Sequence, residues 1–155
     1  MYNFQNLNVL ITGATGGIGK SLAQAFIKTG ANLFLVSSSE DKIQSLKNEI
    51  SNASNLNLFA VDLSNKNEVY EFCDKLLENQ SQIDVVVNNA GLTDDTLFMR
   101  MSDEAWIKVF NVNLNASMII CKKFIRPMIK ARWGRVINIS SVVGSTGNAG
   151  QANYS

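Results

Sequence analysis

Short apolar runs alternate along the chain with longer stretches in which apolar residues recur at helical spacing. The short runs are nearly continuous and rich in Val, Ile and Leu, which is typical of strands buried on both faces of a parallel sheet. The pattern predicts five such strands, at residues 8–12, 32–37, 56–61, 84–88 and 135–140.

The stretches between these runs are predicted to be helices. Apolar residues share one stripe in each of three of them, which are residues 18–29, residues 40–50 and a stretch through Val69, Phe72, Cys73 and Leu76. Residues 103–131 form a fourth, longer helix, with Ser102 as its N-cap and with Pro127 interrupting it late. Repeated strand–helix–strand order implies an α/β fold, a Rossmann-type doubly wound parallel sheet with helices on both faces and right-handed crossovers.

The length, composition and charge of the chain narrow the class of protein. With 155 residues and no repeat, low-complexity linker or charge block, it is expected to form a single domain over residues 1–155. No apolar run approaches the roughly 20 residues that span a bilayer, and the first residues are too polar for a secretion signal, so we expect a cytoplasmic protein without a membrane partner. The formal net charge of +1 argues against binding of nucleic acid through a global field.

The residue types present also limit the chemistry. The chain contains no histidine, which excludes Ser-His-Asp and Cys-His nucleophilic sites and leaves Tyr, Lys, carboxylates or water to move protons. Cys73 and Cys121 lie far apart with no second ligand-type residue nearby, so neither a disulfide framework nor a metal site is expected.

A glycine-rich turn joins the first predicted strand to the first predicted helix. Residues 12–19 read Thr-Gly-Ala-Thr-Gly-Gly-Ile-Gly, with the spacing G-x-x-x-G-x-G. Glycines let the backbone turn tightly and approach a pyrophosphate, which lies against exposed amides at the positive end of the following helix. A tight connection without a ligand is the alternative for this motif taken alone. The candidate contacts of a dinucleotide here are Gly13, Ala14, Thr15, Gly16, Gly17, Ile18 and Gly19.

Two further candidate contacts follow predicted strands. Small residues in the sequence Asn-Asn-Ala-Gly at 88–91 would let this loop lie along a ligand, with its amides holding backbone geometry or ribose hydroxyls, although a plain turn explains it equally. Asp62 is placed where a carboxylate accepts from an adenine amino group, although a lone Asp is more often a helix cap. The candidates are Asp62, Leu63, Asn89, Ala90 and Gly91, at the sheet edge where open α/β folds bind ligands.

Together these motifs resemble the short-chain dehydrogenase/reductase family. T-G-x-x-x-G-I-G, N-N-A-G, Asn113 in N-V-N-L, Ser141 in I-S-S-V and Tyr154 follow the order and spacing of that family over the whole chain. The resemblance implies that Tyr154 is the acid/base and also contacts the cofactor, that Ser141 hydrogen-bonds the substrate carbonyl, and that Asn113 holds a water of the proton relay. It also implies a lysine at position 158 and further strands and helices beyond Ser155.

The lysine matters because a tyrosine with an ordinary pKa of about 10 is a poor proton donor at neutral pH without a nearby positive charge. Taken singly, each candidate has another interpretation. Asn113 would then bridge two helices, Ser141 would end a strand, and Tyr154 would be an aromatic core residue.

Two longer runs, residues 89–101 and 141–154, are similar to bacterial 3-oxoacyl-[acyl-carrier-protein] reductases. This similarity implies a homotetramer that reduces a 3-oxoacyl thioester on an acidic acyl carrier protein in fatty-acid elongation. Arg132 matches a carrier-docking arginine of such enzymes, although a solvated helix face is an equal alternative. The basic residues near the end of the long predicted helix are Lys122, Lys123, Arg126, Lys130 and Arg132.

The second predicted strand ends in Ser37-Ser38-Ser39, without the carboxylate that NAD-preferring members use to bind a ribose hydroxyl. Ser38 is therefore a candidate contact, and the small hydroxyls favour NADPH. Many NADPH-using relatives have an arginine in the glycine-rich turn, where this chain has Gly16. A reductase of a free ketone or alcohol and a non-catalytic nucleotide-binding module remain the alternatives.

Overall fold

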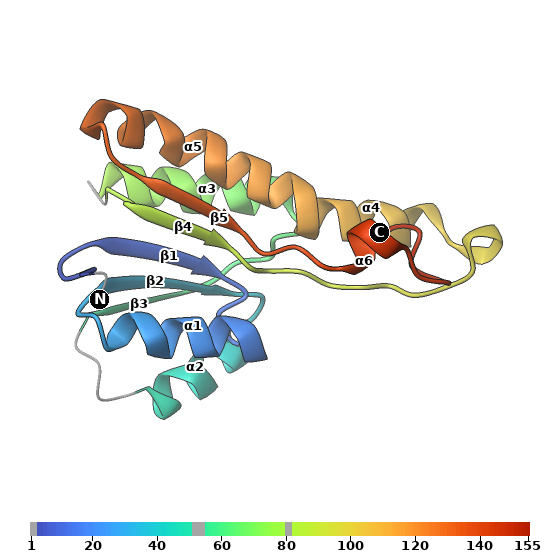
Figure 1. The fold of residues 1–155 in the computed structure, drawn as a ribbon, viewed down its shortest axis with the longest axis horizontal. Helices are drawn as coiled ribbons and strands as arrows, with labels where there is room; N and C mark the ends of the chain where they lie inside the picture. Colours follow the sequence, from blue (N-terminus) through green and yellow to red (C-terminus); the bar gives the residue numbers. More distant parts are fainter. Residues whose placement is uncertain (1–2, 51–54, 80–81) are drawn as a thin grey trace.

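In the computed structural model, five parallel strands form one sheet between two layers of helices (Figure 1). The structure describes residues 3–50, 55–79 and 82–155. The strands are β1 (Asn8–Thr12), β2 (Asn32–Ser37), β3 (Leu56–Ala60), β4 (Val85–Asn88) and β5 (Arg135–Asn138). Their order is β3-β2-β1-β4-β5, so the chain changes direction across the sheet between β1 and β4, which is the point where doubly wound folds bind ligands. The predicted fold class is confirmed.

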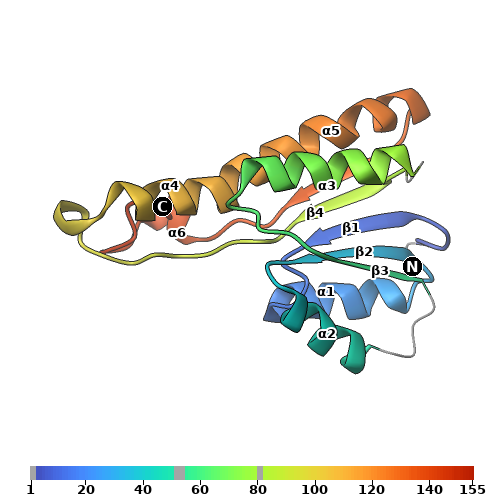
Figure 2. The same cartoon turned by 180° about the vertical axis from the view of Figure 1, so that it is seen from behind.

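Helices cover both faces of the sheet (Figure 2). On one face lie α1 (Gly17–Ile27) and α2 (Glu40–Glu49), and on the other lie α3 (Lys66–Glu78) and α5 (Ala116–Ala131). The 3-10 turn η1 (Phe98–Arg100), helix α4 (Asp103–Phe110), the π-helical segment η2 (Asn111–Asn115) and the short helix α6 (Val143–Thr146) complete the described elements. Both views show that α4, α6 and the loop after β4 extend beyond the carboxyl ends of the strands.

The core consists of two apolar layers that share the strands. Because strand side chains alternate, Leu10 and Val86 pack toward α3 and α5, whereas Val9 and Leu33 pack toward α1 and α2. This explains the continuous apolar runs of β1, β2 and β4. The edge strand β5 differs, because all four of its residues are exposed. The apolar run therefore predicted this strand correctly but not its burial.

The long predicted helix is helical throughout but not uniform. Ser102 caps it as expected, because its Oγ accepts a hydrogen bond from the backbone N–H of Ala105 at 3.2 Å. Between α4 and α5 the backbone widens into the π-helical segment η2, which the sequence pattern did not predict. The expected interruption at Pro127 is wrong, because α5 continues to Ala131. The buried side chains of Phe124 and Met128 hold the helix on the sheet across the proline.

Candidate functional site

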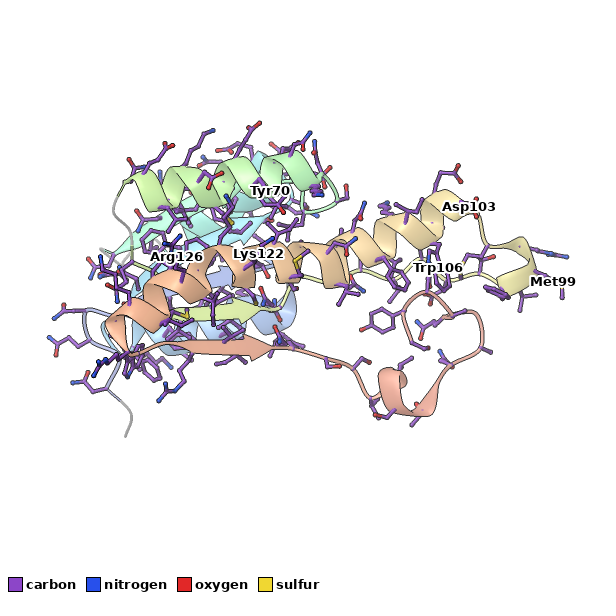
Figure 3. All side chains as sticks on the ribbon, turned by 90° about the horizontal axis from the view of Figure 1, so that it is seen from above. Tyr70, Met99, Asp103, Trp106, Lys122 and Arg126 are labelled. Carbon is purple, nitrogen blue, oxygen red and sulfur yellow. The ribbon has the colours of Figure 1, made fainter. Side chains whose placement is uncertain are left out.

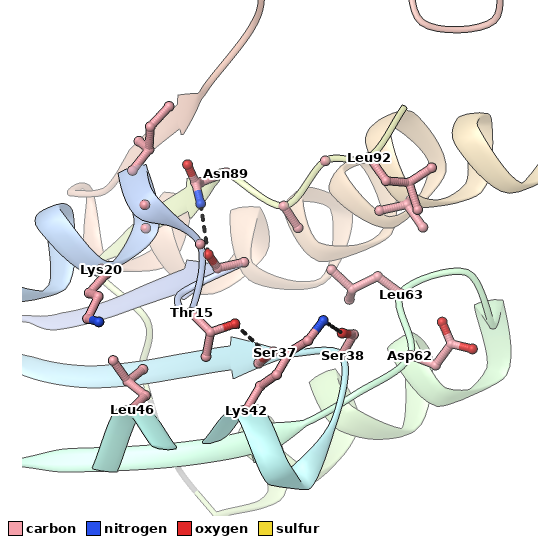
Figure 4. Close-up of a pocket in the computed structure, with 18 of the residues that line it drawn as sticks. Thr15, Lys20, Ser37, Ser38, Lys42, Leu46, Asp62, Leu63, Asn89 and Leu92 are labelled. Carbon is pink, nitrogen blue, oxygen red and sulfur yellow. Dashed lines mark hydrogen bonds between the residues drawn. The ribbon is translucent and has the colours of Figure 1, made fainter. Parts of the chain in front are cut away.

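A cavity of about 790 Å³ lies at the carboxyl ends of the strands, over the point where the strand order reverses (Figure 4). It is lined by the glycine-rich turn, by the ends of β2 and β3 and by the loop after β4. The candidate contacts in its lining are Gly13, Thr15, Gly16, Gly17, Ile18, Gly19, Ser38, Asp62, Leu63, Asn89, Ala90 and Gly91. Two candidates lie elsewhere. Ala14 is fully buried in the core, and Tyr154 lies in the segment that follows α6.

The glycine-rich turn is tightly folded against the loop after β4. Gly13 has a φ of +64°, and a Cβ atom there would lie 2.8 Å from the Cα of Ala90. A Cβ at Gly19 would lie 2.2 Å from the carbonyl oxygen of Gly13. Helix α1 then begins at Gly17 without a side-chain cap, so its first backbone N–H groups are left for a ligand. The glycines thus leave a space, the glycine cradle, that the Cβ atoms of other residues would fill.

Thr12 and Asn89 join this turn to the loop after β4. The side-chain Nδ2 of Asn89 donates to the carbonyl oxygens of Thr12 and Gly13, at 3.0 and 3.1 Å. In return, Thr12 Oγ1 accepts from the backbone N–H groups of Asn89 and Ala90, at 3.1 and 3.0 Å. Asn89 therefore holds backbone geometry, one of its two expected roles. Sequence reasoning missed Thr12, and the only signal was its place directly before the glycines.

The end of β2 carries hydroxyl groups and a cation. Thr15 Oγ1 and Ser37 Oγ are hydrogen-bonded at 2.8 Å, which ties the glycine-rich turn to β2. Lys42, on the first turn of α2, donates from Nζ to Ser38 Oγ at 3.3 Å and lines the cavity. Sequence reasoning missed this lysine, although its place four residues after Ser38 was a signal that the two side chains could meet.

Asp62 braces the connection between β3 and α3. Its Oδ1 accepts from the backbone N–H and from the Oγ of Ser64, at 2.9 and 2.7 Å. The cap of α3 is Asn65, whose side chain accepts from the N–H of Asn67. Asp62 thus lines the cavity and stabilises a local turn, and the alternative that it caps the helix is wrong, because Asn65 is the cap. Its contact with adenine stays a prediction.

Asn113, Ser141 and Tyr154 lie outside the cavity lining, and Asn113 is hydrogen-bonded to a residue of that lining. Asn113 Oδ1 accepts from the N–H of Leu92 at 2.9 Å, and its Nδ2 donates to the Leu92 carbonyl at 3.0 Å. Leu92 itself lines the cavity. Both polar atoms of the Asn113 amide are therefore bonded to the loop after β4. These bonds explain why an asparagine, which has a low helix propensity, occurs in the helical segment η2.

The same loop holds the segment that carries Tyr154. The N–H of Thr96 donates to the Gly150 carbonyl at 2.9 Å, and Asn153 Nδ2 donates to the Asp94 carbonyl at 3.0 Å. Tyr154 is half-buried in this segment. Ser141 Oγ accepts from the N–H of Val143 at 3.2 Å, at the start of the turn into α6. The loop after β4 is thus bonded to Asn113 and to the segment of Tyr154. Within the described part of the chain, the three candidates form no hydrogen bond with one another's side chains.

The family model described as short chain dehydrogenase matches residues 7–155. The chain belongs to the short-chain dehydrogenase family. It is similar to the 3-oxoacyl-[acyl-carrier-protein] reductases FabG of Rickettsia prowazekii, with 43% identity over 94% of the chain, and of Aquifex aeolicus, with 38% identity over 94%. It is also similar to nodulation protein G of a Rhizobium species, with 41% identity over 99%. The expected resemblance to the FabG branch is thereby confirmed.

A solved relative supports the same family. The crystal structure of a metagenomic short-chain oxidoreductase in complex with NADP superposes with a TM-score of 0.91 and 31% identity, covering 97% of this chain and 68% of that one. The chain spans 58–62% of the length of the three curated short-chain dehydrogenase relatives above.

Basic side chains of this short-chain dehydrogenase are displayed along α5 (Figure 3). Lys122, Arg126 and Lys130 are exposed, and Arg132 is exposed at the end of the helix with a φ of +54°. Lys123 differs, because its Nζ is paired with the carboxylate of Asp74 on α3. Four of the five expected basic residues are therefore available on the surface.

Other ionisable groups of the described residues offer no competing site. Burial raises the pKa of the Cys73 thiol to about 12, so this cysteine stays protonated at neutral pH. Residues 3–50, 55–79 and 82–155 contain no group of three or more metal-ligating side chains. Over the same residues, no helix has the length and apolar character of a membrane span.

Proposed function

We propose that the full-length protein is an NADPH-dependent 3-oxoacyl-[acyl-carrier-protein] reductase that forms 3-hydroxyacyl thioesters in fatty-acid elongation. The main support for the proposal is the pair of hydrogen bonds between Leu92 and Asn113. One end of the dinucleotide-sized cavity is bonded through Leu92 to Asn113, and the loop that continues from Leu92 holds the segment of Tyr154. A cofactor in the cavity would therefore end beside the candidate catalytic residues.

The lining of the cavity fits a dinucleotide. The glycine cradle, which a Cβ at Gly13 or Gly19 would fill, accepts a pyrophosphate, and the free amides at the start of α1 complement its charge. In this proposal Ser38 contacts the adenosine ribose, Asp62 and Leu63 contact the adenine, and the loop of Asn89, Ala90 and Gly91 lies along the nicotinamide half. The solved relative is in complex with a nucleotide of this class, NADP.

The proposed reaction adds a hydride to the carbonyl carbon and a proton to the carbonyl oxygen. NADPH, when bound, supplies the hydride. Ser141 donates a hydrogen bond to the carbonyl oxygen, and Tyr154 donates its phenolic proton to that oxygen as negative charge develops on it. Asn113 holds a water that returns the proton to Tyr154. A lysine at position 158, which lies beyond this chain, is expected to supply the positive charge that the phenol requires.

Turnover by the full-length protein tests the proposed activity. NADPH consumption is measured with an acetoacetyl thioester, with acetoacetyl carrier protein and with simple ketones at equal concentrations. The proposal expects both thioesters to be reduced and the carrier-bound one to give the highest kcat/KM. Reduction of simple ketones alone would support a reductase of free ketones instead. Binding of nucleotide without any turnover would support a non-catalytic module.

The exposed basic residues of α5 suit an acidic carrier protein, with Arg132 as the main contact. The variant Arg132→Glu is expected to lower kcat/KM for acetoacetyl carrier protein at least tenfold and to leave reduction of the free thioester unchanged. Lys28→Glu, an exposed residue at the end of α1 on the opposite face, is the matched control and should change neither rate. Equal effects of the two variants would contradict docking at Arg132.

We also propose that the full-length protein is a cytoplasmic homotetramer. Support comes from exposed apolar side chains on α5 and the end of η2, spaced four, seven and four residues apart, at Leu114, Met118, Ile125 and Ile129. Sedimentation of Ile129→Glu beside the wild type tests the proposal. It expects tetramers of the wild type and smaller species of the variant, and a monomeric wild type would contradict it.

A further inference from the structure

We propose that Lys42 is the residue that selects a 2′-phosphorylated nucleotide in this protein. The inference rests on the proposed nucleotide site and adds the group that discriminates between NADPH and NADH. Many NADPH-using relatives have an arginine in the glycine-rich turn. This chain has Gly16 there, so a different cation is needed to bind the 2′-phosphate.

Lys42 lies where the 2′ position of a bound adenosine ribose is expected. In Rossmann-type folds the residues after the second strand contact the 2′ position of the adenosine ribose. Here those residues are hydroxyl-bearing, and Lys42 extends back from α2 so that its Nζ donates to Ser38 Oγ at 3.3 Å (Figure 4). Both residues line the cavity, and so does Ser45, one helical turn after Lys42. A phosphate here would meet an ammonium group and small hydroxyls.

The positive charge of Lys42 also favours a phosphate at this position. Lys20, the other lysine near this wall of the cavity, is ion-paired with Glu49, so its charge is balanced within the protein. Lys42 has no carboxylate within ion-pair distance among the residues that the structure describes. Its charge is therefore unbalanced, and a phosphate dianion would balance it through a charge-assisted hydrogen bond. A ribose hydroxyl, which is neutral, would gain much less.

The exposure of Lys42 decides whether the residue can be replaced without loss of the fold. The side chain of Lys42 is exposed and lies outside both apolar layers, so its removal should leave the fold intact. Lys47 lies on the same helix, is also exposed and does not line the cavity, which makes it a matched control.

The test measures dissociation constants of NADP⁺ and NAD⁺ by calorimetry with the full-length wild type, Lys42→Ala, Lys42→Glu and Lys47→Ala. Binding of 2′,5′-ADP and of 5′-AMP is measured in the same way, because these two ligands differ only in the 2′-phosphate. Lys42→Ala is expected to weaken the binding of NADP⁺ and 2′,5′-ADP on the order of tenfold. It is expected to change the affinity for NAD⁺ and 5′-AMP less than about twofold. Lys42→Glu should weaken NADP⁺ further, and Lys47→Ala should behave as the wild type.

The outcomes separate this inference from the proposed function. A wild type that prefers NADP⁺, together with a Lys42→Ala variant that keeps the full preference, would overturn the role of Lys42 and leave the proposed function standing. A wild type that binds NAD⁺ as tightly as NADP⁺, or neither nucleotide, would overturn the NADPH-dependent function itself.

Discussion

The side-chain amide of Asn113 forms two hydrogen bonds with the backbone of Leu92, one through each of its polar atoms, at 2.9 and 3.0 Å. The two residues are 21 positions apart in the sequence. The pair joins the π-helical segment η2 to the loop that begins in the cavity and then holds the segment of Tyr154. This amide group is therefore one of the direct links between the nucleotide cavity and the segment that carries a candidate catalytic residue.

Replacing that amide should loosen the site. Asn113→Leu leaves the N–H and C=O groups of Leu92 without their partners, so the free energy of unfolding is expected to fall by roughly 1–3 kcal/mol. Urea unfolding of the full-length protein measures it. Asn115→Leu is the control, because Asn115 is exposed in the same segment and donates only to the side chain of Asn111. A loss for Asn113→Leu no larger than for Asn115→Leu would show that the Leu92 pair contributes little.

Thr12 should be important for nucleotide binding, although it does not line the cavity. Thr12→Val keeps the shape but removes the Oγ1 that accepts from Asn89 and Ala90, so two backbone N–H groups lose their acceptor. Affinity for NADP⁺ is expected to fall about tenfold. Thr12→Ser retains the hydroxyl and should restore most of the affinity, whereas equal binding by all three proteins would be evidence against this bracing role.

The glycines of the turn should differ sharply in their tolerance of a methyl group. A Cβ at Gly19 would overlap the Gly13 carbonyl, whereas a Cβ at Gly17 meets nothing within 4 Å. Gly19→Ala should therefore lower the free energy of unfolding by roughly 1–3 kcal/mol. Gly17→Ala, at the start of α1, should leave it unchanged or raise it by up to about 1 kcal/mol. Similar effects of the two substitutions would contradict the tight cradle.

The buried thiol of Cys73 should make stability depend on alkaline pH. Burial raises its pKa from 9.0 to about 12, with Lys123 lowering it and Asp74 raising it by smaller amounts. Because the folded pKa is the higher one, the thiol's contribution is complete below pH 9 and is lost as the pH rises toward 12, by at most about 1.4 kcal/mol per pH unit. The difference in free energy of unfolding between the wild type and Cys73→Ala should narrow between pH 9 and 10.5. A constant difference would mean that the thiol titrates normally.

Features set by local sequence patterns were predicted well. The bounds of β1 and β2 agree with their apolar runs, and Ser102 caps α4 as its position suggested, because burial on both faces and capping leave direct marks in the sequence. The lining of the cavity was predicted mostly from turn motifs at strand ends, since parallel strands bring those ends to one edge.

Features that depend on tertiary contacts were not predicted. Nothing near Asn113 in the sequence marks the π-helical segment, which accompanies the bonds to Leu92. Ala14 was expected to contact a cofactor, but the turn directs it into the core. Lys42 differs, because its bond to Ser38 is local, four residues apart, and the sequence analysis missed it. The catalytic roles of Asn113, Ser141 and Tyr154 stay predictions.

In the proposed reaction, a phenolic proton and a hydride reach one carbonyl group at the end of this cavity. The most direct measurement is kcat for reduction of an acetoacetyl thioester by full-length Tyr154→Phe, with NADPH binding measured in parallel. The kcat of this variant is expected to fall at least a hundredfold, because a general acid contributes about 10²–10⁴-fold, while NADPH still binds. A variant that binds NADPH and retains wild-type kcat would contradict the proposed reaction.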